Sequence, residues 1–245
     1  MNIHEKLILG NRALPEPETL TTLDIYSRAK LLGTELADKK VLEGKITFKK
    51  CYIFSLQSIQ SNSPLAEIMP DRAKSDFYLI RIPFTLHPAP GDNYYKKVTF
   101  FIKSVNRDVT AFDLQPRDVA TKVEITKAYT ISPQIKFKEI ELTAGEVSGQ
   151  IHFEGLRPTI SAFGIGDSTF YWIYSGSADE QVYSGTKECL VILDVPQGTK
   201  TVEASISYEV VIAKNMFGMW KHKDASSDEY SICWDLNTAQ PFPNT

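Results

Sequence analysis

The feature that most constrains the fold is a series of short apolar runs, each of strand length and each ended by turn residues. Four of them lie in the second half of the chain, at residues 147–153, 170–174, 190–195 and 202–212. Gly and Ser are frequent between the runs, as is typical of turns between β-strands. Runs this short and this regularly interrupted favour antiparallel sheets over helices or a parallel sheet.

The second half of the chain, residues 144–245, is predicted to be one β-sandwich domain. Trp172 lies on an expected central strand, and a Pro196–Gly198 corner separates the two strands that follow it. This arrangement resembles the immunoglobulin-like fold, although the pair of Cys that usually flanks such a Trp is absent. The resemblance implies a sandwich with Trp172 buried between the sheets, and no particular activity.

The first half, residues 1–143, is predicted to be a second β-sandwich behind an N-terminal helix. Apolar residues recur every three or four positions from Thr19 to Lys40, which predicts an amphipathic helix. From Gly44 onward the apolar period becomes two, which predicts strands. The expected fold is therefore mainly β, with two antiparallel sandwich domains joined at Thr143–Gly145, and the basic first half and acidic second half support this division.

Charge and cysteine content set expectations for partners and compartment. The net charge of −3 argues against a nucleic-acid partner. No stretch reaches the roughly 18 apolar residues of a membrane-spanning helix, and the N-terminal apolar run is too short for a signal peptide. The scattered Cys51, Cys189 and Cys233 indicate reduced thiols, with a Cys189–Cys233 pair left open. These features predict a cytoplasmic protein without integral membrane association.

The sequence contains one candidate nucleophile. Ser168 follows Gly166 and Asp167, which is similar to the serine motif of hydrolases. No Gly-x-Ser-x-Gly surrounds it, and none of the four His lies in a recognisable catalytic context. The alternative, a β-turn at Gly164–Asp167, is the prediction we adopt.

Carboxylates offer two further candidates. Glu139 and Glu141 share one face of an expected strand, where a glycosidase pair and a solvated edge are both conceivable. Asp179 and Glu180 lie in a polar loop that could hold Ca²⁺, but without regular ligand spacing. Cys and His are too scattered for a zinc site. We therefore predict no catalytic residue, no metal, no cofactor and no enzymatic activity.

The segment that follows the last long apolar run is rich in side chains that bind other surfaces. Met216, Phe217, Met219 and Trp220 lie close together, with lysines on the C-terminal side. Met and aromatic residues are enriched at protein interfaces, so these four are predicted to be partner-binding. Two alternatives stay open, namely a loop that covers its own core and a peripheral membrane contact through Trp220.

The predicted function is therefore that of a non-enzymatic protein-binding module, an adaptor, regulator or assembly subunit with a protein partner and an oligomeric state that stays open. The expected N-terminal helix either packs on its own sheet or docks into a partner groove. One alternative is a subunit of a larger protease or nuclease complex or particle that is bound or cleaved. Another is a hydrolase with a cleft between the two domains.

Overall fold

A computed structural model describes residues 17–29, 39–57, 74–119, 127–128, 150–151, 159–176, 181–216 and 219–241. These residues are almost entirely β-structure. The elements are β1 (Thr19–Ala29), β2 (Lys39–Lys49), β3 (Tyr52–Ser55), β4 (Ser75–Leu86), β5 (Tyr94–Ser104), β6 (Thr110–Gln115), β7 (Asp118–Val119), β8 (Lys127–Ala128), β9 (Gln150–Ile151), β10 (Thr159–Phe163), β11 (Thr169–Ser175), β12 (Gly185–Pro196), β13 (Thr201–Met216), β14 (Met219–Ser227), β15 (Tyr230–Asp235), the 3-10 helix η1 (Leu236–Thr238) and β16 (Gln240–Pro241).

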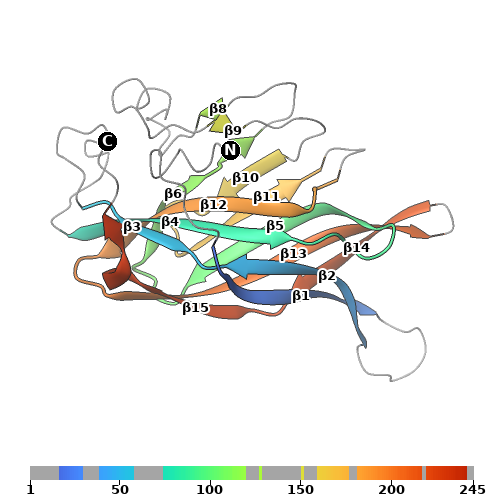
Figure 1. The fold of residues 1–245 in the computed structure, drawn as a ribbon, viewed down its shortest axis with the longest axis horizontal. Helices are drawn as coiled ribbons and strands as arrows, with labels where there is room; N and C mark the ends of the chain where they lie inside the picture. Colours follow the sequence, from blue (N-terminus) through green and yellow to red (C-terminus); the bar gives the residue numbers. More distant parts are fainter. Residues whose placement is uncertain are drawn as a thin grey trace.

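All strands except β8 and β9 belong to one sheet (Figure 1). Its main path runs β3-β4-β2-β1-β14-β13-β5-β11-β10-β7, while β12 and β6 continue it from the other edge of β4. The pairings are antiparallel apart from the short contact of β16 with β3. The two ends of this path meet where Ala111 of β6 bridges Ile165, just before β11. The sheet therefore curls back on itself and nearly closes.

Aromatic rings fill the space that the curled sheet encloses. The Phe100 ring on β5 stacks on Trp172 of β11 and on Tyr208 of β13, with centroid distances of 5.7 and 4.8 Å. Phe84 of β4 reaches the same ring at 5.2 Å. Offset and tilted ring contacts of this kind add to the stabilisation from apolar burial. The prediction that Trp172 is a buried core residue is confirmed, since its exposure is 0%.

The predicted N-terminal helix is wrong. Residues Thr19–Ala29 form strand β1, which pairs with β2 along its length and with β14 near Ile25. Leu20, Leu23 and Tyr26 have helical spacing. In the structure, however, Ile25 and Ser27 are the buried residues, and their spacing of two is that of a strand. Partner strands thus override a weak local preference. Among the described residues no helix is long and apolar enough to cross a membrane.

The predicted pair of sandwich domains, the second of them immunoglobulin-like, is also wrong. Strands from the two halves of the sequence alternate within one sheet: β12 pairs with β4 along its whole length, and β13 pairs with β5. Thr143–Gly145, the predicted junction, lies outside the described residues. Local apolar patterns predict strands well, but they carry no information about which distant strand each one pairs with.

Candidate functional site

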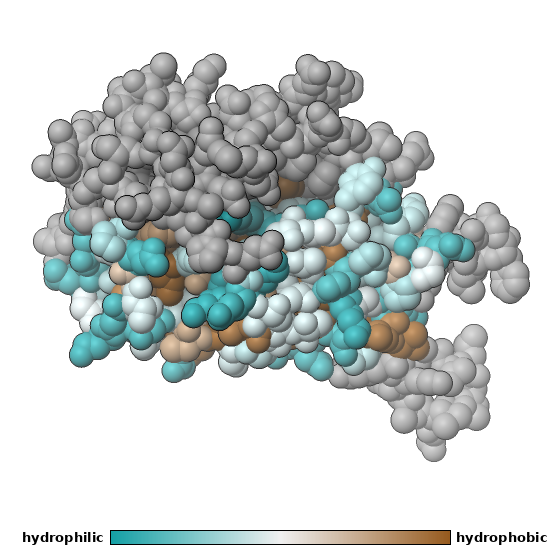
Figure 2. All heavy atoms as spheres, in the orientation of Figure 1, coloured by the Kyte–Doolittle hydropathy of each residue, from teal (hydrophilic) through white to brown (hydrophobic). Residues whose placement is uncertain are grey.

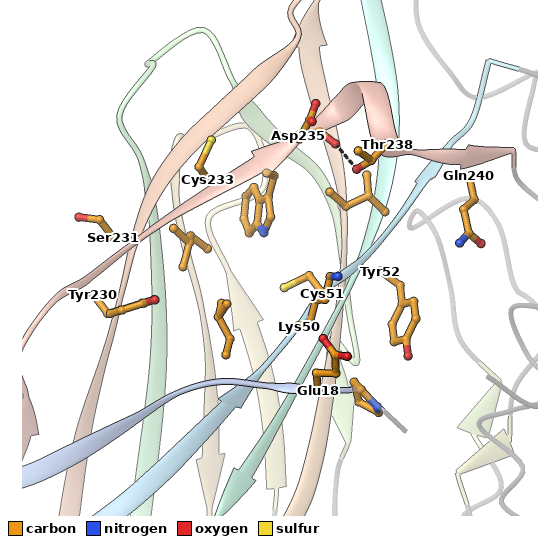
Figure 3. Close-up of a pocket in the computed structure, with 15 residues that line it drawn as sticks. Glu18, Lys50, Cys51, Tyr52, Tyr230, Ser231, Cys233, Asp235, Thr238 and Gln240 are labelled. Atoms are coloured by element: carbon orange, nitrogen blue, oxygen red, sulfur yellow. Dashed lines mark hydrogen bonds between the residues drawn. The ribbon is translucent and has the colours of Figure 1, made fainter. Parts of the chain in front are cut away.

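One groove in the described part of the molecule lies where two parts of the sheet separate. Strand β13 pairs first with β15 and then with β14, and only β14 continues to β1. Along β15 the facing edge is therefore open within the described part of the chain, and a groove of about 780 Å³ runs between it and β3. Figure 3 shows Ser231, Cys233 and Asp235 along β15 and Lys50 and Tyr52 across from them.

The groove holds polar groups that serve the local fold. Asp235 accepts from the backbone N–H of Asn237 at 3.0 Å and so caps η1. The Thr238 hydroxyl donates to the Asp235 carbonyl at 2.7 Å. Burial raises the pKa of the Cys51 thiol to about 12, and a contact with Trp234 lowers it by less. Cys51 is therefore a protonated thiol near neutral pH, and the groove has no activated nucleophile there.

Three of the four predicted partner-binding residues fall at the ends of β13 and β14, which project at one end of the molecule (Figure 1). Met216 ends β13 and pairs with Met219, which begins β14, while Asn215 pairs with Trp220. Phe217 lies outside the described residues. Met216 and Met219 are therefore paired ends of neighbouring strands, and partner binding by the four residues stays a prediction.

A buried carboxylate connects this hairpin to its neighbours. Glu43 of β2 is 1% exposed, accepts from the Ser27 hydroxyl of β1 at 2.6 Å, and accepts from the Lys223 ammonium of β14 at 3.0 Å. Three successive strands of the sheet therefore contribute to one polar cluster. A buried carboxylate requires such donors, because an unpaired charge there would be costly.

The outer face of β4, β12 and β6 carries a second set of buried groups. Leu190 and Ile192 of β12 are 7% and 4% exposed, yet neither belongs to the central core. Beside them the Arg81 guanidinium donates two hydrogen bonds to Glu188, at 2.6 and 2.7 Å, and lies over the Tyr52 ring. Charges and apolar groups are therefore buried together on this side of the sheet.

The same face carries Asp113 of β6, which is 1% exposed. Arg117 donates to it at 2.9 Å and the Gln115 amide at 3.3 Å. Burial raises the pKa of the Asp113 carboxyl to about 8, against the opposing effect of Arg117 and of the Leu114 backbone N–H. Near neutral pH this carboxyl is therefore largely protonated, and Arg117 donates to a mostly neutral group.

Strand β7, directly after Arg117, is the last described part of the main sheet before β8. Val119 of β7 pairs with Ile160 of β10, so the departing and returning segments lie side by side at the sheet edge. Between them β8 pairs antiparallel with β9 in a two-stranded sheet of its own, with Lys127 opposite Ile151. Strand β9 lies inside the apolar run 147–153 that was predicted to be a strand, whereas β8 was not predicted from the sequence.

The remaining sequence candidates do not form a catalytic group. The backbone N–H of Asp167 donates to the Gly164 carbonyl at 3.1 Å, which confirms the predicted turn next to Ser168. His87 bonds instead to Thr47, at 2.7 Å. Within the described ranges no cluster of His, Cys, Asp or Glu could hold a metal, and all three Cys are free thiols. The carboxylate pairs at 139/141 and 179/180 lie outside those ranges.

Figure 2 shows the chemical character of one face of the molecule. The described surface in this view is mostly hydrophilic, with apolar side chains in small separate areas. The few large apolar side chains exposed above 40% include Phe163, Ile165 and Val105. Single exposed apolar residues are ordinary in soluble proteins. The groove beside β15, the β13–β14 hairpin and the β8–β9 pair are therefore clearer candidate sites than this surface.

No protein-family model matches the sequence, and no curated protein matches it either. The solved structures that resemble this chain include the following three. The Clostridium perfringens delta-toxin is 13% identical, with a TM-score of 0.44 over 80% of this chain and 93% of the toxin. A pore forming protein is 8% identical, with a TM-score of 0.44 over 89% and 99% of the chains. The Clostridium perfringens NetB toxin in its membrane-inserted form is 8% identical, with a TM-score of 0.39 over 89% and 97%.

At these identities and TM-scores the overlays do not by themselves assign a fold or an activity to this chain. They do run against several sequence-based predictions, because these proteins are two toxins and a pore forming protein, one of them in a membrane-inserted form. These similarities contradict the predicted function, so the adaptor, regulator, assembly subunit and complex subunit are wrong. The alternative of a hydrolase with a cleft between two domains is wrong as well, because the two domains are absent from the described sheet. The predicted cytoplasmic location and lack of integral membrane association are wrong as well. The expected helix and interdomain cleft, on which several of these ideas depended, are replaced by one continuous sheet.

Proposed function

We propose that this chain is a pore-forming protein whose residues 120–158 supply a β-hairpin that enters a lipid bilayer. The observation that carries the proposal is the antiparallel pairing of β8 with β9 outside the main sheet. Because Val119 and Ile160 are paired neighbours, the intervening segment can extend away without separating strands of the main sheet. The proposal rests on this chain's own hairpin rather than on the structural neighbours.

The sequence around β8 and β9 alternates as a membrane-spanning hairpin requires. The pairing of Lys127 with Ile151 places odd-numbered residues of both strands on one face. Most large residues at odd positions of this segment are apolar, namely Val123, Ile125, Tyr129, Ile131, Ile135, Phe137, Val147, Ile151 and Phe153, and the charged exceptions are Lys127, Glu139, Glu141 and Arg157. Even positions are mostly polar, including Lys122, Glu124, Thr126, Thr130, Gln134, Lys136, Ser148, Gln150 and Glu154. Transmembrane strands show this alternation over about 9–11 residues.

One hairpin cannot form a pore alone. Its two outer edges would leave backbone N–H and C=O groups unpaired in the hydrocarbon, where each costs several kcal/mol. Several copies must therefore contribute one hairpin each, so that every edge pairs with the next copy and the apolar faces turn to lipid. The polar faces would then line a water-filled channel. Such a protein acts by permeation and needs no catalytic residue or cofactor.

The test compares two adjacent residues on opposite faces of the proposed hairpin. Ile131→Lys places a charge on the lipid face, which costs about 2–4 kcal/mol near the bilayer centre. Dye release from vesicles should then fall by at least about 30-fold, since 1.4 kcal/mol corresponds to tenfold. The matched control, Thr130→Lys, adds the same charge to the channel face. It should keep dye release and shift the ion selectivity of single channels toward anions.

Both variants are first compared with the wild-type chain by thermal unfolding, so that a loss of dye release is not mistaken for a loss of the folded structure. Equal dye release by the Ile131 and Thr130 variants would contradict the assignment of faces. A wild-type chain that releases no dye from any vesicle composition would contradict the proposed function itself.

A further inference from the structure

A row of aromatic side chains crosses the outer face of three neighbouring strands, β10, β11 and β5 (Figure 1). Phe100 and Ile102 of β5 belong to the core, so Phe101 between them points outward. Phe163 lies opposite Tyr171, and Tyr171 lies opposite Phe101. The Tyr171 ring stacks on that of Phe163 with centroids 5.2 Å apart and is tilted against that of Phe101 at 5.1 Å. The three rings therefore form one continuous row.

The row of rings ends where it meets β13. The residue opposite Phe101 on β13 is Ser207, whose small side chain cannot stack on a ring. Phe101 is half-buried, and within the described part of the chain its ring contacts only that of Tyr171. The face of an aromatic ring is electron-rich and attracts positively polarised C–H groups. One side of the Phe101 ring, above Ser207, is therefore open to a ligand with a flat C–H surface.

A groove of about 620 Å³ adjoins the end of this row on the same face. Its lining includes Thr99 and Glu209, which lie opposite each other. Thr99 is two residues from Phe101 along β5, and Glu209 is two residues from Ser207 along β13, which is about 7 Å in a strand. From there the groove extends across β14 to Tyr26 of β1. The ring and the groove therefore form one site, with a volume in the usual range of about 300–1,000 Å³ for ligand pockets.

The charged groups of the groove favour a ligand that donates hydrogen bonds. Glu209, Asp224 and Lys97 are exposed in its lining, and none of them forms a salt bridge within the described part of the chain. Ionised carboxylates only accept hydrogen bonds, so the first two require donors from a ligand or from water. Thr99, which is 4% exposed, adds a hydroxyl at the floor. Two carboxylates beside one ammonium repel anions, which argues against phosphates and nucleic acids as ligands.

We infer that the Phe101 ring and the adjoining groove bind a neutral oligosaccharide. A sugar ring has a C–H face that stacks on Phe101 and hydroxyl groups that donate to Glu209 and Asp224. An apolar chain would leave both carboxylates without donors, whereas a sugar satisfies the ring and the carboxylates together. Because the ring and the carboxylates are about 7 Å apart along the strands, the ligand needs at least two sugar units. The inference goes beyond the proposed pore, since none of these residues belongs to the segment 120–158.

The experiment measures saturation-transfer NMR of the full chain with lactose, maltotriose, mannotriose and tri-N-acetylchitotriose, and with 3′-sialyllactose as the anionic counterpart of lactose. At least one neutral oligosaccharide should bind, and 3′-sialyllactose should bind no better than lactose. The Kd of the neutral ligand is then measured by calorimetry. Phe101→Leu keeps an apolar side chain but removes the flat ring, and should weaken binding about tenfold. Glu209→Gln should weaken binding by at least about tenfold, because hydrogen bonds to a charged acceptor are the stronger ones.

Two matched controls make the same chemical changes outside the site. Phe163→Leu alters the ring at the far end of the row, and Glu203→Gln removes a carboxylate from the same face of β13, about 20 Å from Glu209. Both should bind as the wild type does, and thermal unfolding of all four variants verifies that each is folded. A wild-type chain that binds none of the neutral oligosaccharides would overturn the inference. Unchanged affinity of Phe101→Leu or Glu209→Gln, or tighter binding of 3′-sialyllactose than of lactose, would overturn it too. Self-association of the chain that Phe101→Leu abolishes, without saccharide binding, would overturn it in favour of a contact between copies.

Discussion

The inside and the outside of the same strands are buried in different ways. On the inner face Phe84 and Phe100 are fully buried in an aromatic cluster. On the outer face of β4, β12 and β6 Ile192 and Asp113 are nearly as inaccessible, at 4% and 1% exposure, but the Arg81–Glu188 ion pair and the Arg117 contact to Asp113 lie among them. The inner face is stabilised mainly by apolar packing, whereas the outer face must also satisfy charges. Burial therefore marks two kinds of surface, one that holds the body together and one suited to a polar contact.

The strongest test of this contrast is in the aromatic cluster. Phe100→Ala removes a ring that contacts Phe84, Trp172 and Tyr208. It should lower the free energy of unfolding by about 3–5 kcal/mol, measured by denaturant titration. The matched control is Phe163→Ala on β10, which is 44% exposed and should cost no more than about 1 kcal/mol. Equal losses would mean that the enclosed rings are not the main source of stability.

A smaller effect is expected from the outer-face ion pair. Glu188→Ala leaves the Arg81 guanidinium, 7% exposed, without its carboxylate. The free energy of unfolding should fall by about 3 kcal/mol, the lower end of the range for broken buried pairs, because Glu188 is less completely buried. Denaturant titration of the single variant gives this loss directly.

The double variant Arg81→Met with Glu188→Leu separates burial from charge. Replacing both members by apolar side chains of similar size is often neutral or stabilising, so this variant should be within about 1 kcal/mol of the wild type. A double variant as unstable as Glu188→Ala would show that the outer face depends on the ion pair for its packing. The contrast between the two faces would then be smaller than the geometry indicates.

The inner face was largely predictable from sequence and the outer face was not. Alternation and apolar runs located Trp172 in the core and predicted strands near 170–174, 190–195 and 202–212, because each signal is local. Arg81 and Glu188 are separated by 107 positions, so no local pattern links them. The helix predicted from Thr19 failed for the same reason, since the strands that select a β conformation there lie elsewhere in the chain.

The candidate sites divide in the same way. The Met216–Trp220 tip was recognised from its composition, which is a property of neighbouring residues. The polar cluster of Glu43 with Ser27 and Lys223 depends on strand register, and the groove beside β15 depends on where the sheet separates. Register and sheet order follow from the assembly of the whole chain, so they became visible only with the structure.

The smallest expected effect concerns pH and the outer-face carboxyl. Burial raises the pKa of Asp113 to about 8, above the usual value of 3.8, so the folded chain holds this proton more tightly than the unfolded chain does. Stability from this group is complete at low pH and is lost as pH rises from about 4 to about 8. Between pH 6 and 7 the free energy of unfolding should fall by about 1 kcal/mol from this one group. Asp113→Asn should remove that slope, and Asp92→Asn, in an exposed turn, should leave it unchanged. Stability that rises over the same interval would show that Arg117 keeps the carboxylate charged, and the outer face would then hold a true buried ion pair at neutral pH.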